Sequence, residues 1–342
     1  MVCCNFDIML FFKILYIFLS STIYIKRKVT CIFYIAHTII KLKHRYFFKI
    51  KQMLRSNSYY KNIQLRDYSS AFSRSAFSDI IKYDDFAHFD WLYSQYSDSF
   101  KNGISYFNFL KTIYSIISKE YRCEYVYKNE LVAHLIKLYG TKNTVAYSEF
   151  HVGNSIVDIA LFNGESKAFE IKTEYDTPRR LEKQLCDYKK VFDKCYLVLP
   201  ADNIDIYASL IDKSVGIITL TRDNNNIVFS TYRDAEKNDM FDVETIMSCL
   251  RIKEYESIVT KWCGHLPDVP QYRMFQECLS VFSNIPMQKL KEYFLTEMKN
   301  RNNNISTIKK TPGFLRQICL SMNLSNKEIN NLLTKLESQT IS

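Results

Sequence analysis

The stretch SIVDIALFNGESKAFEIKT, residues 155–173, decides the fold of this chain. Its apolar residues form two runs of strand length, and the Asn163-Gly164 pair between them favours a tight turn. Within these runs stand Asp158, Glu170 and Lys172. Buried charges are costly unless they are paired or bind a metal ion, so the stretch predicts a β-hairpin that carries a functional site.

The residues before this stretch extend the same sheet. VAYSEFHV (145–152) predicts another strand, joined to the hairpin by a Gly153-Asn154 turn. KNELVAHLIKLYG (128–140) predicts a helix that is capped by Asn129 and ends at Gly140. The core therefore begins with a helix and a three-stranded meander.

The residues after it add a helix and a buried strand. Residues 176–193 predict a helix that Asp176 or Thr177 caps, with Pro178 in the first turn, where its missing N–H costs nothing. CYLVLP (195–200) has no polar face, which suits a strand buried on both sides. The order helix, meander, helix, strand predicts an α/β fold with a mixed sheet flanked by helices.

Four regions are expected along the chain. They are an apolar basic extension (1–52), a helical N-terminal subdomain (53–127), the α/β core (128–235) and a helical C-terminal domain (236–342). In the last region, residues 315–336 have the spacing of a helix-turn-helix, with Asn323 at the turn and Ser325 as the cap of the second helix. This pattern is permissive, and a plain helical hairpin is favoured over a DNA-contacting motif.

Charge and cysteine content exclude some classes. The net charge is +10, but residues 1–52 carry nine Lys or Arg against Asp7 alone, which leaves only +2 for the other residues. Bulk basicity is therefore no argument for nucleic-acid binding by the core. The ten cysteines show no paired CxxC spacing, so neither a zinc site nor a disulfide framework is indicated, and free thiols in a cytoplasmic protein are expected.

The first 52 residues allow two interpretations. The run FDIMLFFKILYIFLSSTIYI, followed by Lys26-Arg27-Lys28, has the length of a membrane helix, although Lys13 interrupts it. The alternative is that the working chain begins at Met53, and that the preceding residues are an upstream extension. We favour the second interpretation, and a membrane partner is then not expected.

Several of these residues carry a family resemblance. Glu130, Asp158, Glu170-Ile171-Lys172 and the Gln184-x3-Tyr188 element together resemble the PD-(D/E)XK nuclease superfamily, and in particular its RecB-like branch. The match covers roughly residues 125–200 and also looks like a family of uncharacterised bacterial proteins assigned to that superfamily. One departure is Val157, which stands where the motif has proline.

The resemblance implies a metal-dependent DNA nuclease. Mg²⁺ or Mn²⁺ would be bound by the carboxylates of Asp158 and Glu170 and by the backbone carbonyl of Ile171, with Glu130 reaching it directly or through water. Lys172 would orient or deprotonate the attacking water or stabilise the transition state. Gln184 and Tyr188 would hold the substrate backbone or the groups around the metal. Exposed bases Arg179, Arg180 and Lys183 would contact phosphates, or they form only a solvated helix face.

A second hypothesis retains the nuclease fold without catalytic activity. In it the chain is a catalytically inactive nuclease-fold module that binds DNA or protein. The presence of both acids favours the nuclease, because a binding module has no reason to keep two carboxylates facing each other. The expected setting is phage defence, DNA repair or mobile-element biology. Endo- or exonuclease action, strand preference, protein partners and oligomeric state do not follow from the sequence.

Binding of one metal ion by both Asp158 and Glu170 requires a particular register of the hairpin. Directly paired residues of an antiparallel hairpin have a constant sum of residue numbers. A two-residue loop would pair Phe162 with Glu165 and turn Asp158 and Glu170 to opposite faces. A three-residue loop, 163–165, pairs Asp158 with Glu170. We therefore predict the three-residue loop, against the usual preference of an Asn-Gly pair, and an Mg²⁺ ion roughly 2.1 Å from each carboxylate.

Overall fold

The structure, a computed structural model, describes residues 58–121, 123–223, 226–301 and 305–341. The two interpretations of residues 1–52 therefore lie outside the described residues. Residues 62–342 form one compact unit, and the fold and sites below belong to it. The boundary predicted between residues 127 and 128 falls inside a helix, α7 (Glu124–Tyr139).

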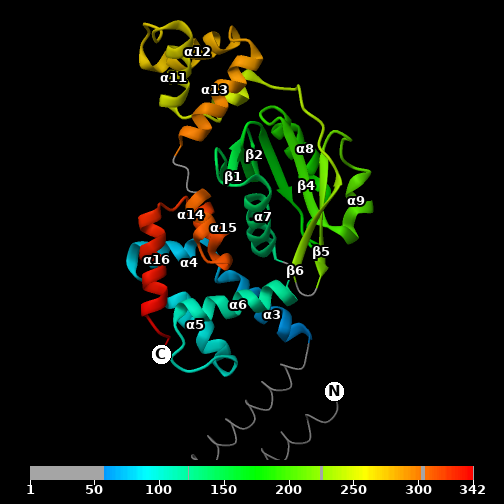
Figure 1. Ribbon diagram of the computed structural model, residues 1–342, viewed down its shortest axis with the longest axis vertical. Coiled ribbons are helices and arrows are strands. Elements are labelled where there is room, and N and C mark those ends of the chain that lie inside the picture. The colour runs from blue at the N-terminus through cyan, green and yellow to red at the C-terminus, as the bar shows by residue number, and fades with distance from the viewer. Residues whose placement is uncertain (1–57, 122, 224–225, 302–304, 342) are drawn as a thin grey trace, which may run out of the picture. The chain divides into compact units, whose positions relative to one another are not determined.

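Six strands in the described residues form one mixed sheet in the order β1-β2-β3-β4-β5-β6, green to yellow-green in Figure 1. The strands are β1 (Val145–Val152), β2 (Ser155–Phe162), β3 (Ser166–Ile171), β4 (Lys194–Pro200), β5 (Gly216–Asp223) and β6 (Asn226–Arg233). The first three form an antiparallel meander, β3, β4 and β5 are parallel, and β6 is antiparallel to β5. The predicted mixed α/β fold is confirmed.

The β2–β3 hairpin has the predicted three-residue loop. Phe162 pairs with Ser166 and Ile159 pairs with Phe169, so the residue numbers sum to 328. Gly164 in the loop has a φ of 110°, a conformation that side chains with a Cβ rarely adopt. The ladder ends at Ile159 with Phe169, so Asp158 and Glu170, whose numbers also sum to 328, lie just beyond its last pair.

The pleat is interrupted at the level of Asp158. Val157 and Ala160 both belong to one core cluster, although residues three apart on a regular strand face opposite sides. Their partners Phe150 and Tyr147 on β1 show the same irregularity. Between those partners lies Glu149, which has a φ of 55° without being glycine. Both strands therefore kink at one level, which is a common device beside functional sites.

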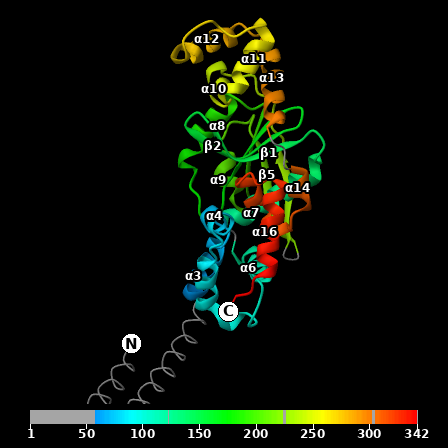
Figure 2. The same ribbon diagram turned by 90° about the vertical axis from the view of Figure 1, so that its left-hand side faces the viewer.

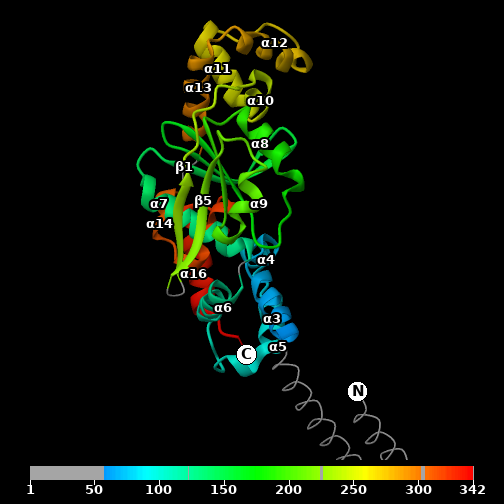
Figure 3. The ribbon, with the colours of Figure 1, turned by 90° about the vertical axis from the view of Figure 1, so that its right-hand side faces the viewer.

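Helices cover both faces of the sheet. In Figure 3, α7 lies on one side of the strands, and α8 (Leu181–Lys189) and α9 (Ile204–Ala208) lie on the other. Leu181, Leu185 and Tyr188 bury the inner face of α8 in the core cluster. The remaining N-terminal helices are α3 (Ser58–Ser70), α4 (Arg74–Tyr83), α5 (Ala87–Tyr96) and α6 (Tyr106–Glu120).

The chain is helical from α10 onward, as the sequence predicted. These helices are α10 (Val243–Ser248), α11 (Ile252–Cys263), α12 (Gln271–Ser283), α13 (Met287–Asn300), α14 (Ile305–Lys310), α15 (Arg316–Ser321) and α16 (Asn326–Ser338). The core cluster continues from the sheet into α10, α11, α12 and α13, while α15 packs against α7 and β1. Figure 2 shows α10 to α13 beyond the end of the sheet near α8.

The predicted turn near the C-terminus is confirmed in detail. Asn323 has a φ of 49°, and Ser325 caps α16 in a capping box with Glu328. Helix α16 buries Ile329, Leu332 and Leu336, and it contacts α4 and α6. The two helices therefore pack mainly against other elements, α15 against α7 and β1 and α16 against α6 and α4.

Two helix starts differ from the prediction. Helix α7 begins at Glu124, and Asn129 is fully buried inside it, so the Asn129 cap is wrong, whereas the end at Gly140 is confirmed. Ahead of α8, Pro178–Arg180 form a 3-10 turn. The Asp176 carboxylate accepts hydrogen bonds from the amide and hydroxyl of Thr173, so it shapes the loop instead of capping the helix.

No helix in the part of the chain that the structure describes is long and apolar enough to cross a membrane.

Candidate active site

Glu170 is the centre of a polar cluster between β3 and α8. Its carboxylate is 3% exposed, and Oε1 accepts from Lys172 Nζ at 2.7 Å and from Gln184 Nε2 at 2.8 Å. Lys172 also donates to Gln184 Oε1 at 3.2 Å. Three residues of the predicted site therefore meet as expected, because residues 170 and 172 share a strand face and Gln184 lies on the inward face of α8.

Tyr188, one turn after Gln184, closes the cluster. Its hydroxyl lies 2.7 Å from Glu170 Oε2 and 2.6 Å from the carbonyl oxygen of Ile156. A tyrosine hydroxyl has one proton, so it cannot donate to both acceptors. A proton on Glu170 would satisfy both contacts, because Glu170 would donate to Tyr188, which would donate to Ile156.

Asp158 is contacted by groups on β3 and α7, whereas the partners of Glu170 lie just after β3 and on α8. Its Oδ2 accepts from the backbone amide of Ile171 at 2.8 Å, and its Oδ1 lies 2.8 Å from the ammonium of Lys128 on α7. Lys128 also pairs with Glu124, one helical turn earlier, at 2.5 Å. Two acids of neighbouring strands thus have separate lysine partners, Lys128 for Asp158 and Lys172 for Glu170.

The electrostatics of the two acids are linked. Burial raises the pKa of Glu170, and the nearby Asp158 carboxylate raises it further, against the opposing effects of Lys172 and Tyr188. Burial also raises the pKa of Asp158, which Lys128 and the Ile171 amide offset only in part. The pKa of Tyr188 is raised by burial and by Glu170. Raised pKa values of neighbouring acids are typical of functional sites.

Glu130 is not brought to this cluster. Its carboxylate accepts from the Tyr114 hydroxyl at 2.5 Å and from Asn129, on a different side of α7 from Lys128. The α7 acid that approaches Asp158 is Glu124, whose charge contributes to the raised pKa of Asp158. The predicted role of Glu130 at the metal therefore has no support in these contacts.

The predicted phosphate-contacting residues lie on the surface next to the cluster. Arg179, Arg180 and Lys183 are exposed, and none makes an ion pair with another residue of the described chain. Arg179 and Arg180 lie in the 3-10 turn before α8, and Lys183 lies in the first turn of α8, so their exposed side chains are available to a ligand.

Sequence reasoning missed Lys128 and Glu124. Lys128 is 7% exposed and lies three and seven residues before Leu131 and Leu135 on the buried stripe of α7. A lysine in an apolar stripe, with an acid four residues earlier, was the available signal. It went unused because the helix was expected to begin after Lys128.

The donor atoms are oxygens of the chemical types that bind hard divalent cations. Two carboxylates and the Ile171 carbonyl, completed by water, are ligands that Mg²⁺ or Mn²⁺ accepts. The negative charge of Asp158 contributes to the raised pKa of Glu170. A bound cation would reduce this repulsion between the two carboxylates. Among the described side chains, no group of three or more His, Cys, Asp or Glu forms a metal site, so the bridging of both carboxylates by one ion stays a prediction.

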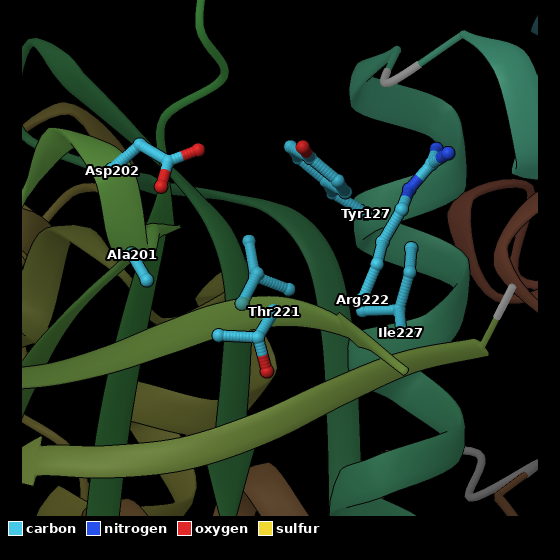
Figure 4. A pocket seen from close by; sticks show the side chains of 7 residues that line it. Tyr127, Ala201, Asp202, Thr221, Arg222 and Ile227 are labelled. Atoms are coloured by element: carbon cyan, nitrogen blue, oxygen red, sulfur yellow. The ribbon is translucent and has the colours of Figure 1, made fainter. Parts of the chain in front are cut away.

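Two hollows lie near the cluster. One of about 200 Å³ opens at the carboxyl end of β4, where Tyr127, Asp202 and Arg222 surround it (Figure 4). The Arg222 guanidinium there donates to the carbonyl groups of Lys119 and Ser118 at the end of α6, so it has a structural use. The other, of about 420 Å³, is lined by Lys128, Glu124, Arg74 and Glu149, among others.

Comparisons with known proteins place this architecture in a family. Over 145 residues the chain is 23% identical to protein cII of Enterobacteria phage P4, which covers 42% of this chain and 53% of that protein, about half its length. A solved structure, the SPO1766 protein of unknown function from Silicibacter pomeroyi, matches 33% of this chain and 70% of its own, with 16% identity and a TM-score of 0.25. The family model of bacteriophage P4 protein cII matches residues 117–337, from the end of α6 into α16. Since that match takes in the whole sheet and more than half of the chain, the chain belongs to the bacteriophage P4 protein cII family.

Proposed function

We propose that this protein is a metal-dependent DNA nuclease of the PD-(D/E)XK type, which hydrolyses phosphodiester bonds. The observation that supports the proposal most is the register of the β2–β3 hairpin. The three-residue loop gives paired residues a number sum of 328, which is also the sum for Asp158 and Glu170, so both acids lie just beyond the last pair, Ile159 with Phe169. A sheet without a site has no need for a buried Glu170 beside a partly buried Asp158, because each costs free energy.

The residues have distinct roles in this proposal. Asp158, Glu170 and the Ile171 carbonyl bind the cation, which when bound would polarise the phosphate and lower the pKa of an attacking water. Lys172, already directed at Glu170 and Gln184, stabilises negative charge on the phosphate oxygens. Gln184 and Tyr188 fix the orientation of the Glu170 carboxylate. Arg179, Arg180 and Lys183 contact the DNA backbone.

A second candidate function has one observation in its favour. Each acid is already in contact with a lysine, Asp158 with Lys128 and Glu170 with Lys172. A module that binds DNA or protein through this fold, without catalysis, would be held together by such pairs and would need no metal. The two proposals differ in their dependence on a divalent cation.

The setting is also a proposal. Membership of a phage protein family supports a role in mobile-element biology, beside the alternatives of phage defence and DNA repair. Action on DNA would take place in the bacterial cytoplasm.

The test is a cleavage assay on the full chain. Linear, circular and single-stranded DNA are incubated with Mg²⁺, Mn²⁺ or EDTA, beside Asp158→Asn, Glu170→Gln and a control, Glu165→Gln, which alters a partly exposed acid of the same hairpin. The nuclease proposal expects cleavage that EDTA abolishes, and a loss of at least about a hundredfold in the first two variants only. DNA binding without cleavage in any metal would favour the binding module.

A further inference from the structure

Lys128 bridges two carboxylates of unequal exposure. Its ammonium lies 2.8 Å from the Asp158 carboxylate, whose side chain is 16% exposed, and 2.5 Å from that of Glu124, which is 61% exposed. Burial alone would lower the pKa of Lys128, but these two acids outweigh burial and raise it, so the lysine is charged. A full positive charge is therefore held at Asp158.

This charge stands where the proposed metal would bind. The Asp158 carboxylate uses Oδ2 for the Ile171 amide and Oδ1 for Lys128. A divalent cation on Asp158 would be repelled strongly by an ammonium at hydrogen-bond distance in a buried site. Lys128 and a metal ion therefore compete for the same carboxylate.

The structure offers Lys128 a second position. Glu124 lies one turn earlier on the same helix, at the spacing at which side chains of a helix meet. The cavity of about 420 Å³ is lined by both Glu124 and Lys128, so the flexible lysine side chain has room to move on that side. Contact with Glu124 can continue after contact with Asp158 is lost.

We propose that Lys128 is a built-in counter-cation, which occupies Asp158 in the metal-free protein and withdraws to Glu124 when a divalent cation binds. The inference rests on the proposed metal-dependent function and goes beyond it, because it assigns a positioning role to a residue outside the nuclease motif. Metal affinity then includes the cost of displacing the lysine from Asp158.

Two substitutions should change metal affinity in opposite directions. Lys128→Met removes the competing charge at similar side-chain length, so Mn²⁺ should bind about tenfold more tightly, a difference of about 1.4 kcal/mol. Glu124→Gln removes the position to which the lysine withdraws, so Mn²⁺ should bind more weakly than to the wild-type chain. A lysine that did not compete with the ion for Asp158 would not weaken Mn²⁺ binding to this extent, so Lys128→Met would bring much less than a tenfold gain.

The experiment is a titration of the full chain with Mn²⁺ alone, followed by calorimetry and by the electron paramagnetic resonance signal of free Mn²⁺. The control is Lys261→Met, which removes a half-exposed lysine from the buried Glu297 far along the chain. It should leave Mn²⁺ affinity unchanged. Thermal melts of each variant establish that the proteins compared are folded.

The outcomes separate the inference from the proposed function. If the wild-type chain binds Mn²⁺ and folded Lys128→Met binds it equally or less well, the inference is overturned and the metal site stands. If only Lys128→Met binds Mn²⁺, the inference is supported, and the natural protein is the metal-free binding module. If neither binds Mn²⁺ at millimolar concentration, the metal-dependent function and the inference both fall.

Discussion

Among the described residues, Asp193 and Glu170 are two buried acids that each contact a lysine, and the pKa of one is lowered while that of the other is raised. Asp193, just before β4, is 3% exposed, pairs with Lys291, and accepts from the amide and hydroxyl of Ser166 at 2.8 and 2.9 Å. Burial works against its charge, but Lys291 and Ser166 outweigh it, and its pKa is lowered. Glu170 is as buried and also has a lysine, yet its pKa is raised.

The difference lies in the number of acids. Asp193 is a single carboxylate with three donors, which is how a structural charge is accommodated in a core. Glu170 has donors too, but Asp158 brings a second negative charge close to it. A buried lysine therefore does not mark an acid as structural. A neighbouring acid that leaves the charge incompletely balanced is the better sign of a binding or catalytic site.

The largest effect expected from this comparison is on stability. Asp193→Ala leaves Lys291, whose side chain is only 13% exposed, without its partner, so the free energy of unfolding should fall by about 3–5 kcal/mol. Urea denaturation of both proteins measures it. A loss below about 1 kcal/mol would mean that the Asp193 group is no more structural than the site.

A smaller loss is expected inside the site. Tyr188→Phe removes the hydroxyl that contacts Glu170 and Ile156, so unfolding should become easier by about 1–2 kcal/mol. Tyr207→Phe is the matched control, since this buried tyrosine donates to the backbone carbonyl of Asp176 away from both acids. Denaturation at a pH where Glu170 is protonated should show a larger gap between wild type and Tyr188→Phe than at neutral pH, because only then is the whole proton chain complete.

The pH dependence of stability should have opposite signs at the two groups. The raised pKa of Glu170 means that folding favours its protonated form, so wild type should lose stability relative to Glu170→Gln as pH rises above about 4.5 through the raised pKa. The lowered pKa of Asp193 means that its charge stabilises the fold above about 3.8, and this advantage over Asp193→Asn is lost as pH falls. Thermal melts from pH 3 to 8, a range of about five pH units, would test both, and parallel curves would remove the distinction.

The smallest effect on the free energy of unfolding is expected for an ion pair in which neither residue is buried. Glu277 pairs with Arg273 on α12, with side chains 35% and 57% exposed. Glu277→Gln should change the free energy of unfolding by no more than about 0.5 kcal/mol. A change as large as that of Asp193→Ala would show that burial is not what separates these groups.

Much of the sheet could be predicted because its signals are local. The strands at residues 145–152 and 155–162 have the expected ends, since apolar runs and Gly-Asn or Asn-Gly pairs specify them. The three-residue loop went against local preference and was predicted from the requirement that Asp158 and Glu170 share a face. The loop length is confirmed, whereas the shared face stays a prediction, because Asp158 contacts Lys128 on α7 and Glu170 contacts Gln184 on α8, on the other side of the sheet.

The errors concern contacts between distant parts of the chain. Asn129 has the chemistry of a helix cap, but its amide binds the Gly313 carbonyl and its oxygen accepts from the Gln317 amide. No local pattern indicates partners more than 180 residues away. Starting the helix at Asn129 then hid Lys128, although the reasoning that singled out Gln184 in α8, a polar residue on an apolar stripe, applies equally to Lys128.

The bonds of Asn129 to residues 313 and 317 also bear on the order of events during synthesis. When a ribosome has produced the complete sheet, the Asn129 side chain, on the helix that carries Lys128, still lacks its partners at residues 313 and 317. Burial of that group is complete only after translation has passed residue 317. The nascent protein should therefore finish the packing of this helix only after the residues that follow α14 have been made.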